Sequence, residues 1–248
     1  MLILPLYDDQ PRTTAPVVTY GLIALCAAVF LWEQSLPPRA ETAVALAYGM
    51  VPAVLFGRVE LPPELQLVPS WATIFTSMFL HGGWMHLIGN MIYLWLFGRG
   101  VESGLGAPRF LVFYLLCGVA AALTQGLIDP SSEVPMIGAS GAIAGTLGAY
   151  LVLHPRANVV VFFWLFIFVR LIAVPAVLLL GLWFLGQLLS ALTAEAGEAG
   201  VAFWAHVGGF VVGMLLVPLF RRRDYAMLQP RRTRPFAIAP PRQRGPWG

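Results

Sequence analysis

Stretches of mostly apolar residues recur along the 248-residue chain, and polar or proline-rich segments separate them. A helix needs about 20 predominantly apolar residues to cross the hydrocarbon core of a bilayer. The spans predicted on this basis are 16–31, 84–97 (or from 73), 110–128, 139–153, 171–190 and 201–220. We therefore expect an all-α integral membrane protein, with a six-span helical bundle over residues 16–220, a short preceding segment, 1–15, and a tail, 221–248.

Two segments do not fit a simple alternation of spans and turns. Residues 32–70 are rich in proline and carry four glutamates, yet they also contain apolar clusters. We expect part of this long loop between the first two spans to lie in the membrane interface as short amphipathic helices. The apolar run 159–190 is too long for one span. Placing Arg170 at the cytoplasmic membrane surface leaves 171–190 as the fifth span and 159–169 along the interface or dipping into it.

Composition supports the membrane assignment, and charge gives it an orientation. The chain is 58% hydrophobic and 11% charged, whereas soluble domains carry about 25% charged residues. Residues 221–248 hold eight arginines and one acidic residue, so the positive-inside rule places this tail in the cytoplasm. With six spans, residues 1–15 are cytoplasmic as well. The predicted location is the inner (plasma) membrane, with the first residues of the fourth and sixth spans toward the extracytoplasmic face.

A basic tail can bind nucleic acid or anionic lipid. This tail is short, proline-rich and poor in aromatic residues, and it directly follows a membrane body. We therefore expect a weak electrostatic contact with the lipid bilayer and no nucleic-acid partner. The same composition predicts that residues 221–248 are disordered.

Ser140 is the first candidate for chemistry, because polar residues inside a membrane are costly and are functional candidates by default. It follows Gly138 and Ala139 at the start of an apolar stretch. The first turn of a helix has unpaired N–H groups and a positive dipole end, so the Ser140 backbone N–H can help to form an oxyanion hole. Gly138 and Gly141 permit the close approach of a substrate. A serine that bonds only to its own or a neighbouring helix is the alternative.

His206 favours the catalytic interpretation of Ser140. It lies in an equally apolar stretch, and Gly209 and Gly213 share its helix face. Small residues at this spacing let two helix backbones come close, and the Ser140 helix has the same spacing in its own glycines. A neutral imidazole within reach of the hydroxyl can act as general base. Every Asp and Glu falls in a loop, in a tail or at the end of a span, so a Ser–His dyad is predicted rather than a triad.

His86 and Asn90 are four residues apart in the second span and therefore share a helix face. Both side chains can donate hydrogen bonds, so they are candidates for completing an oxyanion hole. Metal binding by His81, His86 and His206 is the competing interpretation. No carboxylate or cysteine accompanies these histidines, and a spacing of five residues does not stack His81 on His86. We therefore expect no metal and no cofactor.

Together these motifs resemble those of the rhomboid family of intramembrane serine proteases, in its bacterial six-span form. The matching segments are 81–90 (HGGWMHLIGN), 138–141 (GASG) and 205–209 (AHVGG), within a likeness that covers about residues 70–215. The resemblance implies that Ser140 is the nucleophile and His206 the base. It also implies a water-filled cavity open to the outside. The substrates would be single-span membrane proteins, cleaved within or near the outer part of their transmembrane helix.

The resemblance extends to supporting residues. Glu102 matches a structural glutamate that helps to anchor the loop next to it, and His81 belongs to the first matching segment. Some members have an aromatic residue four positions after the serine, where this chain has Ala144, so another residue must orient His206. The tryptophan–arginine pair often found before the histidine motif is here Trp71-Ala72, which leaves open how the first loop is anchored.

Two other functions, a pseudoprotease and a transporter, are alternatives to a protease. A rhomboid-like pseudoprotease would hold membrane clients without cutting them, but such proteins usually lack the serine or the histidine, and both are present here. A small transporter would spread polar residues along a path through the membrane, and an inverted repeat would favour it. The sequence has no such repeat, and its polar span residues cluster toward one side. Oligomeric state and physiological substrate are not predicted.

Overall fold

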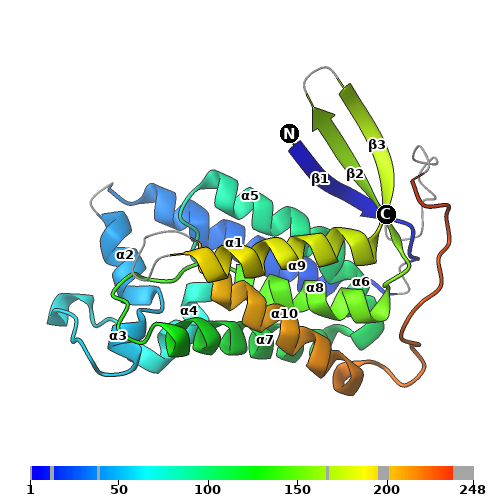
Figure 1. Cartoon of the computed structure of the whole chain (residues 1–248). Helices are drawn as coiled ribbons and strands as arrows, with labels where there is room; N and C mark the ends of the chain where they lie inside the picture. Colours follow the sequence, from blue (N-terminus) through cyan, green and yellow to red (C-terminus); the bar gives the residue numbers. More distant parts are fainter. Residues whose placement is uncertain (1, 12–13, 38–39, 166–167, 195–200, 237–248) are drawn as a thin grey trace.

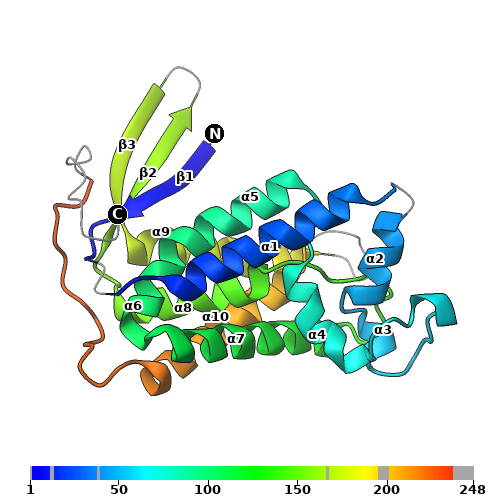
Figure 2. The same cartoon turned by 180° about the vertical axis from the view of Figure 1, so that it is seen from behind.

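The computed structural model describes the chain except for residues 1, 12–13, 38–39, 166–167, 195–200 and 237–248. Its long helices run roughly side by side in one bundle, and a small β-sheet projects from one end of it (Figures 1 and 2). The bundle is built from α1 (Val17–Ser35), α5 (Trp84–Tyr93), η4 (Leu94–Gly98), α6 (Arg99–Leu105), α7 (Ala107–Ile128), α8 (Ser140–Leu153), α9 (Ala176–Thr193) and α10 (Phe203–Phe220). The membrane-helix bundle expected from the sequence is therefore present.

The predicted spans agree with helices of the bundle to within a few residues at most ends. Among the described residues, α1, α7, α9 and α10 are each long and apolar enough to cross a membrane, and α8 is a shorter apolar helix. The second predicted span corresponds to α5, which continues through the π-helical turn η4 directly into α6. Helical structure thus extends from residue 84 to 105, beyond the expected end at 97.

The long loop after α1 contains the short helices expected there. They are α2 (Ala40–Tyr48), α3 (Pro52–Leu55) and η1 (Pro63–Leu65), followed by η2 (Ser70–Ala72), α4 (Thr73–Thr76) and η3 (Ser77–Phe79). Trp71, at the position of the tryptophan–arginine pair, is exposed. Instead, Met50 exchanges two backbone hydrogen bonds with Met136, of 3.0 and 2.8 Å, and the Thr76 hydroxyl donates to the Tyr48 carbonyl. The Met50–Met136 bonds fasten the first loop to the segment that precedes α8, and the Thr76 bond fastens α4 to the end of α2.

The fold is mostly helical, as expected, but one end of the molecule carries a small sheet that the expectation of an all-α protein did not include. The strands β1 (Leu2–Asp8), β2 (Asn158–Leu165) and β3 (Phe168–Pro175) form an antiparallel sheet in the order β1-β2-β3. The segments contain runs of valine and phenylalanine, which favour strands over helices, and pairing of β2 with β3 satisfies their backbone groups. The predicted fifth span, 171–190, therefore begins later, at Ala176, because Pro175 ends the strand and caps the helix.

The described part of the C-terminal tail, residues 221–236, packs against the same end of the bundle. The Asp9 carboxylate accepts hydrogen bonds from the Asn158 N–H and from the backbone and hydroxyl of Thr233. Leu228 and Gln229 donate their backbone N–H groups to carbonyls at the end of α8. One polar cluster thus joins the first strand, the second strand and the tail; the rest of the tail, 237–248, lies outside the described residues.

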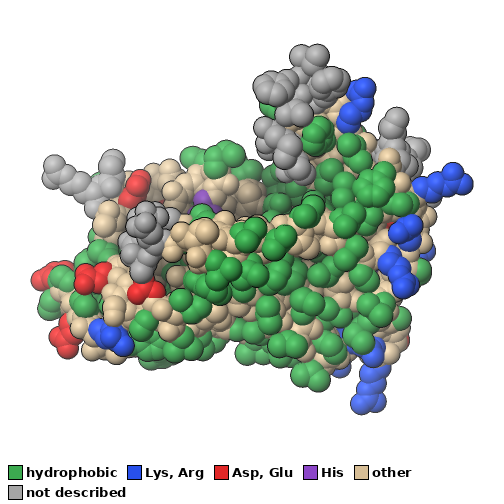
Figure 3. All heavy atoms as spheres, viewed as in Figure 1, with side chains coloured by type: hydrophobic (Ala, Val, Ile, Leu, Met, Phe, Trp, Pro, Cys, Tyr) green, Lys and Arg blue, Asp and Glu red, His purple; other side chains and the backbone are tan. Residues whose placement is uncertain are grey.

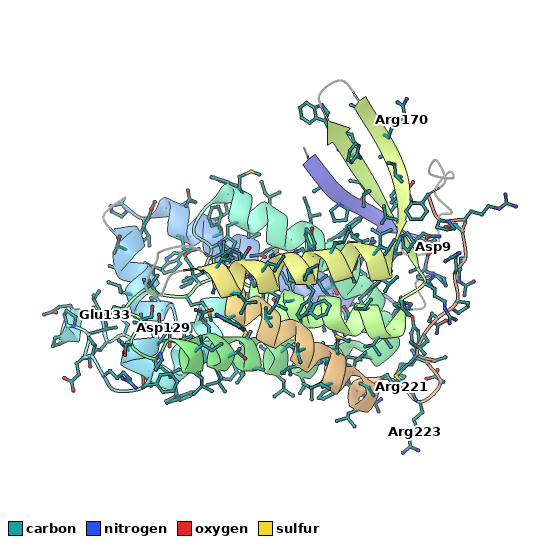
Figure 4. The ribbon with its side chains drawn as sticks, in the orientation of Figure 1. Asp9, Asp129, Glu133, Arg170, Arg221 and Arg223 are labelled. Atoms are coloured by element: carbon teal, nitrogen blue, oxygen red, sulfur yellow. The ribbon has the colours of Figure 1, made fainter. Side chains whose placement is uncertain are left out.

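Charge is segregated between the two ends of the bundle. Acidic side chains gather at the end formed by α2 and α3, arginines gather at the opposite end, and apolar side chains cover the surface between them (Figure 3). Asp129 and Glu133 lie at the acidic end, while Arg221 and Arg223 lie at the basic end (Figure 4). Arg12 and Arg39 lie outside the described residues.

Glu102 is fully buried and caps the first helix. Its carboxylate accepts the backbone N–H groups of Val18 and Thr19, at 2.9 and 2.8 Å, and the Thr19 hydroxyl at 2.7 Å. These bonds satisfy N–H groups that have no partner within α1, and a negative charge at a helix N-terminus is favourable. The glutamate therefore fixes the N-terminus of α1, whereas the resemblance implied that it anchors its neighbouring loop.

We expect Glu102→Ala to lower the free energy of unfolding by about 2–4 kcal/mol, because it leaves buried donors unpaired. Unfolding in micelles, followed by steric trapping, measures this change. The exposed Glu60 supplies the control: Glu60→Ala is expected to alter stability by less than about 0.5 kcal/mol. Equal stabilities of the two variants would contradict the capping role.

Candidate active site

Ser140 is the first residue of α8, and the chain reaches it through a turn that depends on glycine. Gly138 has a φ of +122°, in a region that disfavours other L-residues, and its N–H donates to the Ser77 carbonyl at 2.8 Å. Ala139 then accepts the first bond of the helix, from the Ile143 N–H. This turn leaves the Ser140 N–H at a helix N-terminus, without a partner inside the helix.

His206 of α10 lies beside Ser140, as the sequence predicted. Its Nε2 is 2.8 Å from the Ser140 Oγ, a normal hydrogen-bond distance. The imidazole is buried, with 8% of its surface exposed. The two residues come from different helices, so their contact depends on how closely α8 and α10 approach.

Glycines set that approach. A Cβ atom on Gly209 would collide with the carbonyl oxygen of Gly141, and a Cβ on Gly213 would collide with that of Gly145. The two helix backbones are therefore in direct contact along this stripe, as the small-residue pattern predicted. Any larger residue in the stripe would separate the helices and lengthen the distance between the serine and the histidine.

Gln187 and Trp183 of α9 hold the other side of the His206 ring. The His206 Nδ1 is 2.6 Å from the Gln187 Oε1, and the Trp183 ring lies 6.0 Å from the imidazole, tilted by 35°. Gln187 and Trp183 therefore contact the His206 ring, whereas Ala144 has no aromatic ring that could stack on it. Gln187 is not among the residues predicted from the sequence, although it is, like Ser140, a polar side chain inside an apolar span.

His86 of α5 lies against the turn before Ser140. A Cβ atom on Gly138 would fall 2.7 Å from both Cε1 and Nε2 of His86, so the absence of a side chain there lets the imidazole approach. The Gly82 backbone N–H donates to the His86 Nδ1 at 3.4 Å. Because Nδ1 accepts this bond, a neutral His86 carries its proton on Nε2, which lies against Gly138.

Asn90 lies one helical turn beyond His86 on the same face of α5. Its side chain is buried, and its Nδ2 has no hydrogen-bond partner among the described residues. Leaving a buried amide donor unpaired costs free energy, and such an orphan calls for an explanation. Within the described residues, the Asn90 Nδ2 is therefore a donor available to a bound molecule.

His81 supports this arrangement from the loop before α5. Its Nδ1–H donates to the Phe79 carbonyl at 3.2 Å, and its ring meets the His86 ring edge to face at 5.2 Å. Its backbone N–H donates to the Glu33 carboxylate at 3.2 Å. In the part of the chain that the structure describes, no group of three or more His, Cys, Asp or Glu side chains could hold a metal ion.

The assembled residues are a serine, a histidine in contact with it and a set of hydrogen-bond donors. The structure brings together Ser140, His206 and His86, which the sequence had placed in three separate segments, and Gly138, Gly141, Gly209 and Gly213 make their approach possible. Within the described residues, the second partner of His206 is a neutral amide rather than a carboxylate. This chemistry suits acyl transfer by a serine activated through a histidine.

Comparison with known proteins gives the class of protein to which this fold and site belong. The family model described as the Rhomboid domain matches residues 68–223, more than half of the chain. The chain therefore belongs to the rhomboid family, and the matched region includes every residue of the candidate active site.

Individual relatives agree with this assignment. The chain is similar to the Rhomboid protease GluP of Bacillus subtilis (strain 168), at 33% identity over 58% of this chain and 27% of the relative. It is also similar to the mitochondrial Rhomboid protein 1 of Saccharomyces cerevisiae, at 33% identity over 60% and 41%. A third relative is the chloroplastic Rhomboid-like protein 11 of Arabidopsis thaliana, at 30% identity over 62% and 54%. The chain thus spans about half or less of the length of these curated relatives.

We expect Gly138→Ala to lower the free energy of unfolding by about 1–3 kcal/mol, because it forces alanine into a positive-φ conformation and drives its Cβ into His86. Gly89→Ala is the matched control. Gly89 lies within α5 with open space around it, so alanine there should be neutral or stabilise by up to about 1 kcal/mol. Unfolding titrations in micelles compare the two variants, and a Gly138→Ala protein as stable as the control would contradict this view of the turn.

Proposed function

We propose that this protein is an intramembrane serine endopeptidase that uses Ser140 and His206 as a catalytic dyad. The observation that carries the proposal is the 2.8 Å contact between the Ser140 Oγ and the His206 Nε2. Membership of a family whose relatives include proteins named as proteases supports it. Both members of the dyad are present and in contact, which argues against a pseudoprotease.

The reaction follows from the geometry. His206 takes the Ser140 hydroxyl proton while the Oγ attacks the carbonyl carbon of the scissile peptide. The resulting oxyanion receives hydrogen bonds from the Ser140 N–H, the His86 Nε2–H and the Asn90 Nδ2. His206 then gives its proton to the leaving amine, and water hydrolyses the acyl-enzyme by the same route. No step requires a cofactor or a metal.

The proposed topology has six spans: α1, the continuous α5–η4–α6 segment, α7, α8, α9 and α10. Both termini lie in the cytoplasm, and the site opens toward the extracytoplasmic side of the inner (plasma) membrane of a bacterium. The segregation of charge supports this orientation, because the arginine-rich end carries β1 and the tail. Ser140 begins α8 directly after the loop that carries Asp129 and Glu133, at the opposite, acidic end.

The proposed substrates are single-span membrane proteins, cleaved within or near the outer part of their transmembrane helix. A peptide carbonyl inside an intact helix is shielded from attack, since its backbone groups are paired. A substrate therefore has to unwind locally near Ser140, and helix-destabilising residues such as Gly, Pro or polar side chains in its span favour cleavage. The lipid bilayer presents such substrates from the side, and no nucleic acid takes part.

Ser140→Ala is expected to abolish cleavage of a single-span reporter substrate by the purified protein in proteoliposomes, because it removes the nucleophile. Gel analysis of the cleavage products measures this loss. Ser35→Ala, which removes an exposed hydroxyl at the end of α1, serves as the control and should cleave normally. Unchanged proteolysis by the Ser140→Ala protein would overturn the proposed function.

Asn90→Leu tests the oxyanion role separately from the fold. We expect kcat to fall by about 10²–10³-fold, as when one oxyanion donor is lost. Thermal stability should stay the same or rise, because the change removes an unpaired buried donor. Met85→Leu, at an exposed position of the same helix, controls for substitution in α5. A normal kcat in the Asn90→Leu protein would exclude this residue from the oxyanion hole.

A further inference from the structure

We propose that Gln187 is a positioning residue for catalysis: its side-chain oxygen selects the productive tautomer of His206 and holds the ring in line with Ser140. This inference rests on the proposed function, and it adds a positioning residue to the proposed Ser140–His206 dyad. The role resembles that of the carboxylate in a catalytic triad, performed here by a neutral amide.

Hydrogen-bond complementarity carries the argument. A neutral imidazole has one N–H, and its other nitrogen accepts. The Gln187 Oε1 can only accept, so at 2.6 Å it requires the proton of His206 on Nδ1. The Nε2 lone pair is then free to accept the Ser140 hydroxyl proton at 2.8 Å. With the Gln187 Oε1 facing Nδ1, the opposite tautomer would bring two lone pairs together there and leave no base toward the serine.

Packing of α9 against α10 fixes the position of the amide. Leu180, Trp183, Phe184, Gln187 and Ala191 recur at helical spacing and form one face of α9. The Phe184 ring stacks on Phe210 of α10 at 4.7 Å, and Trp183 lies 6.0 Å from the same ring. Phe210 is four residues after His206, so these contacts set the register in which Gln187 meets the imidazole.

An amide also suits this position better than a carboxylate does. The site lies within apolar helices, where a charged side chain is costly. A neutral hydrogen-bond acceptor orients the histidine without burying a charge. It stabilises the imidazolium formed during the reaction less than a carboxylate would, so a carboxylate in its place should change the pH dependence of the rate.

The test compares three variants of the full-length protein in proteoliposomes, with a single-span reporter substrate. Gln187→Met keeps the length of the side chain and removes the acceptor; kcat should fall by about 100-fold, as for a misplaced catalytic group, while KM stays within about twofold. Gln187→Glu restores an acceptor and should recover most of this loss. The acid limb of its rate–pH profile should also move to higher pH, because a carboxylate favours the charged imidazole. Leu189→Met, on an exposed part of α9, should behave like the unmodified protein.

The outcomes separate a positioning role from a structural one. A Gln187→Met protein with unchanged kcat overturns the inference, as does a Gln187→Glu protein that is no more active than Gln187→Met. A loss of activity that parallels a loss of thermal stability also overturns it, because it indicates damage to packing. If Ser140→Ala still cleaves, the proposed function itself fails. If Ser140→Ala is inactive while Gln187→Met is fully active, only the role of Gln187 is rejected.

Discussion

Direct backbone contact between α8 and α10 is the constraint on which the candidate site depends. Gly209 and Gly213 lie against the carbonyls of Gly141 and Gly145, where no side chain would fit. Apolar side chains gain little by leaving lipid for a helix interface, so close packing of small residues has to hold these helices together. The same proximity brings His206 within hydrogen-bond distance of Ser140. One structural feature therefore serves both membrane packing and chemistry.

The polar groups of the candidate site differ in whether they already have hydrogen-bond partners within the described residues. Gln187, His206 and Ser140 form a continuous hydrogen-bonded series, which lowers the cost of placing them among apolar helices. Asn90 departs from this rule, because its buried amide nitrogen has no partner within the described residues. In the proposed mechanism, that unmet hydrogen bond is made when negative charge develops on the substrate, so binding is strongest at the transition state.

The sequence was a good guide to the bundle and a poor guide to its basic end. The lengths of the apolar stretches alone located α1, α7, α8 and α10. A helix inside a bilayer needs apolar side chains over most of its length, and this requirement is visible in the sequence. It failed over 159–175, since a run of apolar residues does not distinguish a buried strand from part of a helix. In the structure these residues pair with each other as β2 and β3, and β2 also pairs with β1, which lies over 150 residues away in the chain.

For the site, the sequence by itself determined the candidate groups: Ser140 and His206 in apolar stretches, each accompanied by glycines, with candidate donors at His86 and Asn90. Those choices follow from the high cost of polar residues in lipid, which is a local property of each segment. Only the tertiary structure showed which residue contacts the second nitrogen of His206 and which groups Glu102 binds, because these partners belong to other helices. Gln187 and the first turn of α1 meet these residues through helix packing, and the geometry of packing is not encoded in the composition of any one segment.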